Sequence, residues 1–108
     1  MTLSKEILNI GLVFSMEFGK NWLQPINKRL HNRFPELTYA ELEDYNLVCQ
    51  EVNKVAHNYI YSNPKKINGV YNFMNLEEFS HFMLKEFNWI SEKNMISLYN
   101  QSCYYASK

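Results

Sequence analysis

Residues 38–62 read TYAELEDYNLVCQEVNKVAHNYIYS and carry the strongest helix signal in the chain. It begins with a capping box, because the side chains of Thr38 and Glu41 can each accept a hydrogen bond from the other residue's free backbone N–H. The pattern that follows predicts an amphipathic helix that faces a core and ends near Ser62. Its apolar residues recur at the three- and four-residue spacing of one helix face: Tyr45, Val48, Val52, Val55 and Tyr59, widened by Leu42, Cys49, Ala56 and Ile60.

The chain before this helix predicts a longer helical segment over residues 4–33. Ser4 is a good N-cap, and apolar side chains lie on nearly all sides of residues 7–18, which is typical of a central, buried helix. Pro25 lacks a backbone N–H and clashes with the preceding turn, so it breaks or kinks this helix. Pro35 then keeps the residue before it out of helical conformation, and the two segments form a hairpin around this point.

Two more helices are predicted in the C-terminal half. One begins after Asn75 as N-cap, and the other begins at Ser91 and continues towards the C-terminus. Only residues 87–90 separate them, and so short a loop makes antiparallel or steeply crossed neighbours. The connection over residues 63–75 contains the turn dipeptides Asn-Pro and Asn-Gly. Its residues 70–73 have an extended pattern, with no partner strand visible in the sequence.

These segments predict an all-α protein. We expect one helical domain over residues 1–108, built as a four-helix bundle of two helical hairpins with a long, Pro-kinked central first helix. The chain carries eleven basic and eleven acidic residues, so its formal net charge is zero. This balance gives no general attraction to nucleic acid or to an anionic membrane.

The cysteines and the N-terminus favour a cytoplasmic protein. Cys49 and Cys103 are the two cysteines, and we expect both to be free thiols. The N-terminal apolar stretch over residues 7–18 lacks the small-residue cleavage site of a signal peptide and is too short to span a bilayer. We therefore expect no membrane association.

No enzyme signature is present in the sequence. It contains no glycine-rich phosphate loop, nucleophile elbow or paired-histidine metal motif, and we expect neither catalysis nor a cofactor. Cys49 and His57 lie on one side of their helix and would supply half of a zinc site, but no second pair of ligands is visible, so no metal is expected. Basic and acidic residues around the first hairpin form complementary solvated faces: Lys28, Arg29 and Arg33 on one side, and Glu36, Glu41 and Asp44 on the other.

The last helix offers the clearest candidate for a binding surface. At roughly 100° per residue, its core face is expected to hold Met95, Ile96, Tyr99, Ser102, Cys103 and Ala106, flanked by Leu98 and Tyr105. The opposite face is rich in amides and ends in an exposed tyrosine, a favoured interface anchor. We predict that it contacts a protein partner, and a second copy of the chain in a homodimer is one candidate for that partner. The predicted surface consists of Lys93, Asn94, Ser97, Asn100, Gln101 and Tyr104.

Residues 76–102 read LEEFSHFMLKEFNWISEKNMISLYNQS and suggest an alternative. This stretch resembles the helix-turn-helix pattern of bacterial DNA-binding proteins, in which the second helix enters the major groove. The resemblance implies a nucleic-acid-binding protein that uses residues 76–106, with Ser97, Asn100 and Gln101 at base edges and Lys93 at a phosphate. The turn departs from the pattern, since Asn88-Trp89 stands where glycine is usual, and the zero net charge disfavours this alternative.

Overall fold

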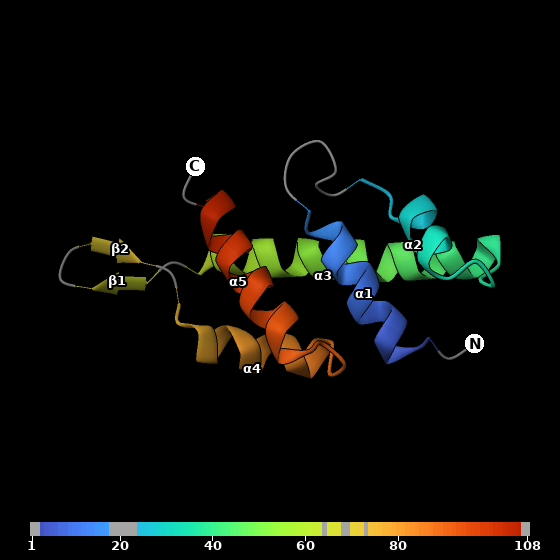
Figure 1. The fold of residues 1–108 in the computed structure, drawn as a ribbon. Helices are drawn as coiled ribbons and strands as arrows, with labels where there is room; N and C mark the ends of the chain where they lie inside the picture. The colour runs from blue at the N-terminus through green and yellow to red at the C-terminus, as the bar shows by residue number, and fades with distance from the viewer. Residues whose placement is uncertain (1–2, 18–23, 64, 68–69, 73, 107–108) are drawn as a thin grey trace. The chain divides into compact units, whose positions relative to one another are not determined.

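The structure is a computed structural model, and it describes residues 3–17, 24–63, 65–67, 70–72 and 74–106. The predicted all-α fold class is confirmed, with five helices and one short antiparallel hairpin in the described residues (Figure 1). The predicted packing as a four-helix bundle stays a prediction. In chain order the elements are α1 Lys5–Ser15, α2 Asn27–Arg33, α3 Tyr39–Ser62, β1 Lys65–Ile67, β2 Val70–Asn72, α4 Leu76–Glu86 and α5 Glu92–Ala106.

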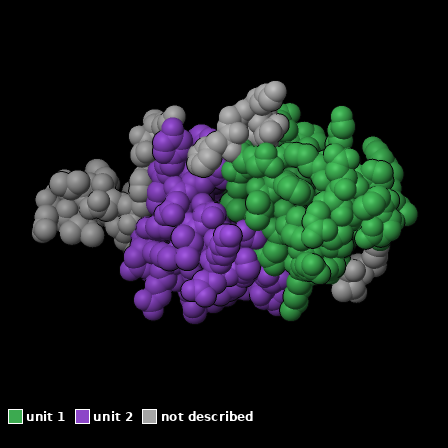
Figure 2. All heavy atoms as spheres, viewed as in Figure 1, with its two compact units in different colours: residues 1–53 green, residues 54–108 purple. Residues whose placement is uncertain are grey.

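The chain forms two compact units, residues 1–53 and residues 54–108 (Figure 2). The boundary falls inside α3, so this helix contributes its first part to unit 1 and its last part to unit 2.

A continuous, kinked helix over residues 4–33 is not what the described residues show, because they form two separate helices in this stretch; an interruption was the other outcome expected from Pro25. Helix α1 ends at Ser15, and α2 begins only at Asn27. Pro25 does not kink a helix but lies before one, because a proline has no N–H to donate and the residue before it avoids helical conformation. The backbone N–H of Ile26 donates instead to Oδ1 of Asn46 on α3, at 3.0 Å. The predicted helical residues 18–23 lie outside the described part of the chain.

The start of α3 follows the prediction, but its buried face is centred differently. The capping box is present, with the Thr38 N–H donating to Glu41 Oε1 at 2.9 Å and the Glu41 N–H donating to Thr38 Oγ1 at 3.2 Å. Val48, Val55 and Tyr59, expected at the centre of the stripe, are only half-buried. The buried face runs instead through Leu42, Tyr45, Asn46, Cys49, Val52, Asn53, Ala56 and Ile60.

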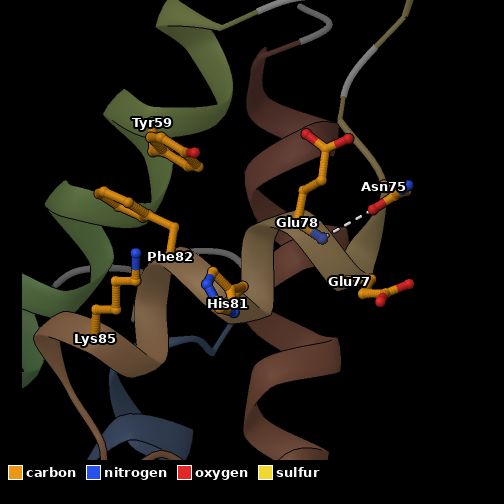
Figure 3. Close-up of a pocket in the computed structure, with 7 residues that line it drawn as sticks. All are labelled: Tyr59, Asn75, Glu77, Glu78, His81, Phe82 and Lys85. Carbon is orange, nitrogen blue, oxygen red and sulfur yellow. Dashed lines mark hydrogen bonds between the residues drawn. The ribbon is translucent and has the colours of Figure 1, made fainter.

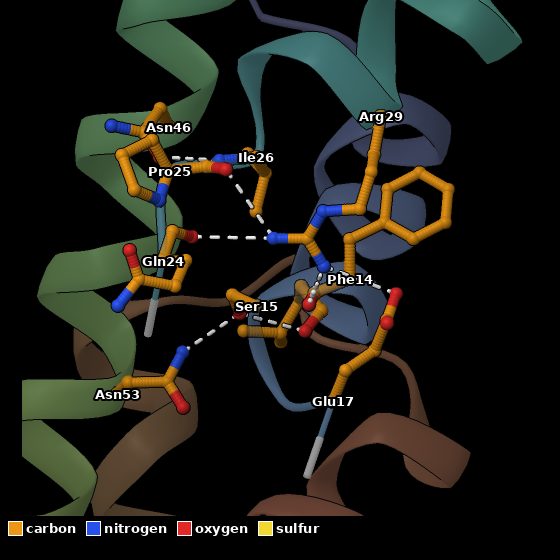
Figure 4. A network of polar contacts seen from close by, with 10 residues as sticks. Phe14, Ser15, Glu17, Gln24, Pro25, Ile26, Arg29, Asn46 and Asn53 are labelled. Atoms are coloured by element: carbon orange, nitrogen blue, oxygen red, sulfur yellow. Dashed lines mark hydrogen bonds and ion pairs between the residues drawn. The ribbon is translucent and has the colours of Figure 1, made fainter. Parts of the chain in front are cut away.

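Two asparagines on this face join α3 to the rest of unit 1 (Figure 4). Asn53 Nδ2 donates to Ser15 Oγ at 2.8 Å, and the Ser15 hydroxyl donates to the Leu12 carbonyl at 2.7 Å. Asn46 Oδ1 accepts a hydrogen bond from the Ile26 N–H. Buried polar groups are tolerated when they are hydrogen-bonded, so these asparagines fix where α1 and the start of α2 contact α3.

Arg29 holds together the ends of the segment between α1 and α2 (Figure 4). Its Nη1 donates to the Phe14 carbonyl at 2.8 Å and pairs with Glu17 Oε1 at 3.1 Å. Its Nη2 lies 3.3 Å from both the Gln24 and the Pro25 carbonyl oxygens. A planar guanidinium with five donors suits such a set of acceptors. The sequence instead suggested that Arg29 lies near the acidic residues at the start of α3.

In unit 2, helices α4 and α5 begin at the predicted caps. The Glu78 N–H donates to Asn75 Oδ1 at 2.8 Å, and the Asn94 N–H donates to Ser91 Oγ at 3.2 Å. The loop between the helices covers residues 87–91, close to the predicted connection. The buried apolar residues of this unit include Ala56, Ile60, Met74, Phe79, Met83, Ile90, Met95 and Leu98.

The connection before α4 contains a β-hairpin, of which only the second strand was predicted from the sequence. Strand β2 lies in the stretch with the predicted extended pattern, and β1 is the partner strand that was not visible. The register pairs Lys65 with Asn72 and Ile67 with Val70. The two strands flank an Asn-Gly dipeptide, a typical sequence for two-residue hairpin loops, which lies outside the described residues. A three-residue strand is too short to show a period-two pattern.

Helix α1 packs tightly against Ile26 and Cys49 at Gly11. A Cβ atom at this position would lie 3.0 Å from Ile26 Cδ1 and 3.2 Å from Cys49 Sγ, and all three residues are buried. We expect Gly11→Ala to lower the free energy of unfolding by about 1 kcal/mol, because overpacking outweighs the better helix propensity of alanine.

A double-mutant cycle with Ile26→Val, measured by urea unfolding, tests this prediction. Removing Cδ1 makes room for the new methyl group, so the double variant should be more stable than the sum of the two single effects predicts. Additive effects, or a Gly11→Ala variant more stable than the wild type, would contradict the close packing at this point.

Candidate functional site

Helix α5 carries the predicted binding surface, but its register differs from the prediction by about one residue, a rotation of roughly 100°. Leu98, expected on the flank, is 0% exposed, whereas Ile96, expected in the core, is 41% exposed. Cys103, also expected in the core, is half-buried. The inner face consists of Asn94, Met95, Leu98, Gln101 and Ser102.

Tyr99 explains why the helix takes this register. Its hydroxyl donates to the Met74 carbonyl at 2.7 Å, and its ring meets Phe79 of α4 edge-on, with the ring centroids 5.5 Å apart. A tyrosine is often placed in this way, with the ring on apolar neighbours and the hydroxyl on a polar partner. Tyr99 therefore sits at the margin of the core, and Leu98 rather than Ile96 points inwards.

The six predicted surface residues divide accordingly. Asn94 and Gln101 are buried, so the prediction that they face solvent is wrong. Hydrophobicity gave no reason to bury these two amides, and the competing three-four pattern through Met95, Leu98 and Ser102 was the signal that would have placed them inside. The remaining four are exposed: Lys93, Ser97, Asn100 and Tyr104.

Together with Ile96, these four residues form a continuous surface that we call the α5 stripe. At roughly 100° per residue its five members lie within a sector of about 100°. Tyr104 is 49% exposed, and its ring meets that of Tyr105 edge-on at 5.1 Å between centroids. The neighbouring Tyr105 is half-buried, so the two adjacent tyrosines have different surroundings, as the sequence predicted.

The charge around the α5 stripe is not basic. The sequence of α4 and α5 contains two lysines, Lys85 and Lys93, against four glutamates. A surface that neutralises phosphates needs an excess of positive charge. The α5 stripe is instead suited to hydrogen bonding and to aromatic contact.

A second candidate site is an open pocket of about 410 Å³ in unit 2, lined by Tyr59 of α3 and by residues of α4 and its N-cap (Figure 3). The rings of Tyr59 and Phe82 stack in parallel along it, 3.6 Å apart at an angle of 8°. Lys85 lies at the end away from Asn75, and His81 lies between them. The aromatic rings and charged groups of this pocket provide contacts for a side chain of a partner protein. The lining residues are Tyr59, Asn75, Glu77, Glu78, His81, Phe82 and Lys85.

Burial governs the titration of the thiols and of one histidine. It raises the pKa of Cys49 to about 12 and lowers the pKa of His57. It also raises the pKa of Cys103, against a smaller lowering effect of the hydrogen bond with Tyr99. The thiolate is the nucleophilic form, so Cys49 stays protonated and unreactive at neutral pH.

The described residues contain neither a cluster of metal ligands nor a membrane-spanning helix. Within them, no three histidine, cysteine, aspartate or glutamate side chains converge as metal ligands. Nor does any described helix have the length and apolar character needed to cross a bilayer.

Comparison with known proteins found no matching family model, no similar curated protein and no similar solved structure.

The raised pKa of Cys49 predicts a loss of stability at alkaline pH. The thiol keeps its proton in the folded chain until about pH 12 but releases it near its ordinary value of 9.0 when unfolded. Its contribution is therefore complete below pH 9.0 and is lost as the pH rises towards 12. Within this window the free energy of unfolding should fall by about 1.4 kcal/mol per pH unit on account of Cys49.

Urea unfolding at about pH 8 and about pH 10.5 measures this slope. Cys49→Ala should lack that part of the decline, whereas the control Cys103→Ala, at a half-buried thiol, should retain it. Equal slopes in the wild type and Cys49→Ala would contradict the burial of a protonated thiol at this position.

Proposed function

We propose that this protein is a protein-interaction module that binds through the α5 stripe. The observation that carries the proposal is the half-exposed ring of Tyr104, which lies on the same helix face as the exposed Ile96. Tyrosine is enriched at protein interfaces because its ring is large and rigid and its hydroxyl tolerates water. The proposal includes no catalytic role and no cofactor, and it places the protein in the cytoplasm, where thiols stay reduced.

The dimensions of the α5 stripe favour a modest interface. From Lys93 to Tyr104 it extends over about 17 Å of helix. A stable complex usually buries about 800 Å² on each partner, more than one helical stripe supplies. A transient complex, or a helix lying along a complementary surface, therefore suits it best.

A second copy of the chain is the partner that the α5 stripe fits best. A two-fold axis near the middle of the helix, with the two helices antiparallel, would place Lys93 opposite Tyr104 of the partner subunit. The same axis would place Ser97 opposite Asn100 of the partner subunit. An ammonium group over a tyrosine ring is attractive, and a serine hydroxyl and an asparagine amide can form a hydrogen bond. The α5 stripe is thus complementary to itself, as an isologous interface requires.

One observation supports the alternative of a nucleic-acid-binding helix-turn-helix over residues 76–106. Lys93, Ser97 and Asn100 are exposed together on the second of two consecutive helices. The burial of Gln101 removes one of the expected base contacts, and the excess of glutamates opposes binding to phosphates. We keep this function as the second candidate.

Light scattering over a concentration series tests the interaction proposal. We expect the wild-type chain to dimerise weakly and Tyr104→Ala to weaken the dimer at least tenfold, with a thermal midpoint within about 2 °C of the wild type. Tyr39→Ala is the matched control, because this exposed tyrosine of unit 1 is not part of the α5 stripe, and its loss should leave the association unchanged.

Two outcomes would count against the proposal. A monomer at every concentration would exclude self-association through the α5 stripe. Binding of random duplex DNA at about 50 mM salt, lost steeply as salt rises and weakened by replacing Lys93, would favour the nucleic-acid function instead.

A further inference from the structure

A smaller pocket of about 220 Å³ lies in unit 2 between the last turns of α3 and α5. His57 and Tyr61, one helical turn apart on α3, line one side of it, and Ser102 and Tyr105 of α5 line the other. Asn58 and Ala106 complete the lining. Ser102 lies on the inner face of α5, so this pocket is distinct from the α5 stripe.

The hydroxyl group of Ser102 is the unusual feature of this pocket. Ser102 is 1% exposed, and within the described part of the chain its Oγ has no hydrogen-bond partner. Folded proteins leave few buried polar atoms without a hydrogen bond, because such an atom destabilises the fold. An alanine at this position would avoid the destabilisation caused by the unpaired hydroxyl. We therefore expect the hydroxyl to donate to an acceptor that lies outside the chain.

The walls of the pocket indicate what kind of molecule would supply that acceptor. The rings of His57 and Tyr105 lie 5.9 Å apart at an angle of 29° and form one aromatic surface. Tyr61 is 73% exposed, so its ring can move over a bound molecule without disturbing the core. No lysine, arginine, aspartate or glutamate lines the pocket, and burial lowers the pKa of His57, which favours its uncharged form. Aromatic walls without charge favour a flat, uncharged ligand.

We propose that this pocket binds a small, uncharged, planar aromatic molecule whose polar substituent accepts a hydrogen bond from the Ser102 hydroxyl. Rotation about χ1 of Ser102 turns the hydroxyl towards the ligand. The volume is adequate, since a cavity of about 150 Å³ holds benzene and this one has room for a single ring with one substituent.

Titration of the full chain with benzamide tests the proposal. Binding is monitored by NMR through the backbone amide resonances of residues 102 and 105. Benzamide combines a flat ring with a carbonyl acceptor, and for so small a ligand we expect a Kd on the order of 1 mM. Cyclohexanecarboxamide carries the same acceptor on a ring that is not flat, and it should bind at least about fivefold more weakly.

Two variants show whether the hydroxyl and the mobile ring take part. Ser102→Ala should weaken benzamide binding about fivefold and raise the thermal midpoint of the ligand-free protein by roughly 4 °C, since it removes an unsatisfied buried group. Ser80→Ala is the matched control, at a half-buried serine of α4 that belongs neither to this pocket nor to the α5 stripe, and it should change neither quantity. Tyr61→Ala, at an exposed side chain that folding does not need, should also weaken binding several-fold.

Three results would overturn the proposal. The first is the absence of saturable shifts at residues 102 and 105 up to about 20 mM benzamide. The second is equal affinity in the wild type and Ser102→Ala. The third is a lower thermal midpoint for Ser102→Ala, because the hydroxyl would then already be hydrogen-bonded in the ligand-free protein.

Discussion

The burial of Leu98 on the inner face of α5 determines where the two proposed binding surfaces of unit 2 lie. Leu98 is inside because Tyr99 lies at the margin of the core, with its ring against Phe79 and its hydroxyl on the Met74 carbonyl. One helical register thus determines two surfaces. It leaves Tyr104 in the exposed α5 stripe, and it places Ser102 in the pocket opposite α3.

Unit 1 depends in a similar way on polar groups inside an apolar environment. Asn53 contacts Ser15 and Asn46 contacts Ile26, so α3 is tied to α1 and to the start of α2 by specific hydrogen bonds as well as by packing. Hydrophobic contact alone allows several rotations of an amphipathic helix, whereas a buried amide must meet its partner. In both units, therefore, hydrogen bonds select among the rotations that apolar burial would allow.

Sequence patterns predicted the elements well where a local signal existed. The caps at Thr38 and Asn75 act over a few residues, and their hydrogen bonds form as expected. The rotation of α3 and α5 could not be predicted in the same way, because both helices bury amides that hydrophobicity places outside. For α5, the prediction placed Asn94 and Gln101 of the candidate site on the surface, whereas both are buried. Tyr104 is exposed, as predicted. Hydrogen bonds between residues far apart in the chain depend on how the helices pack, and a single sequence does not reveal them.

The register of α5 determines which residues are buried in unit 2, and a pair of charge substitutions can distinguish its inner face from its outer face. Leu98→Asp places a carboxylate in the apolar interior, whereas Ile96→Asp places it on the half-exposed α5 stripe. Thermal unfolding followed by circular dichroism should show that Leu98→Asp abolishes the cooperative transition while Ile96→Asp shifts the midpoint by only about 4 °C or less. A folded, cooperative Leu98→Asp variant beside an unfolded Ile96→Asp variant would contradict this register.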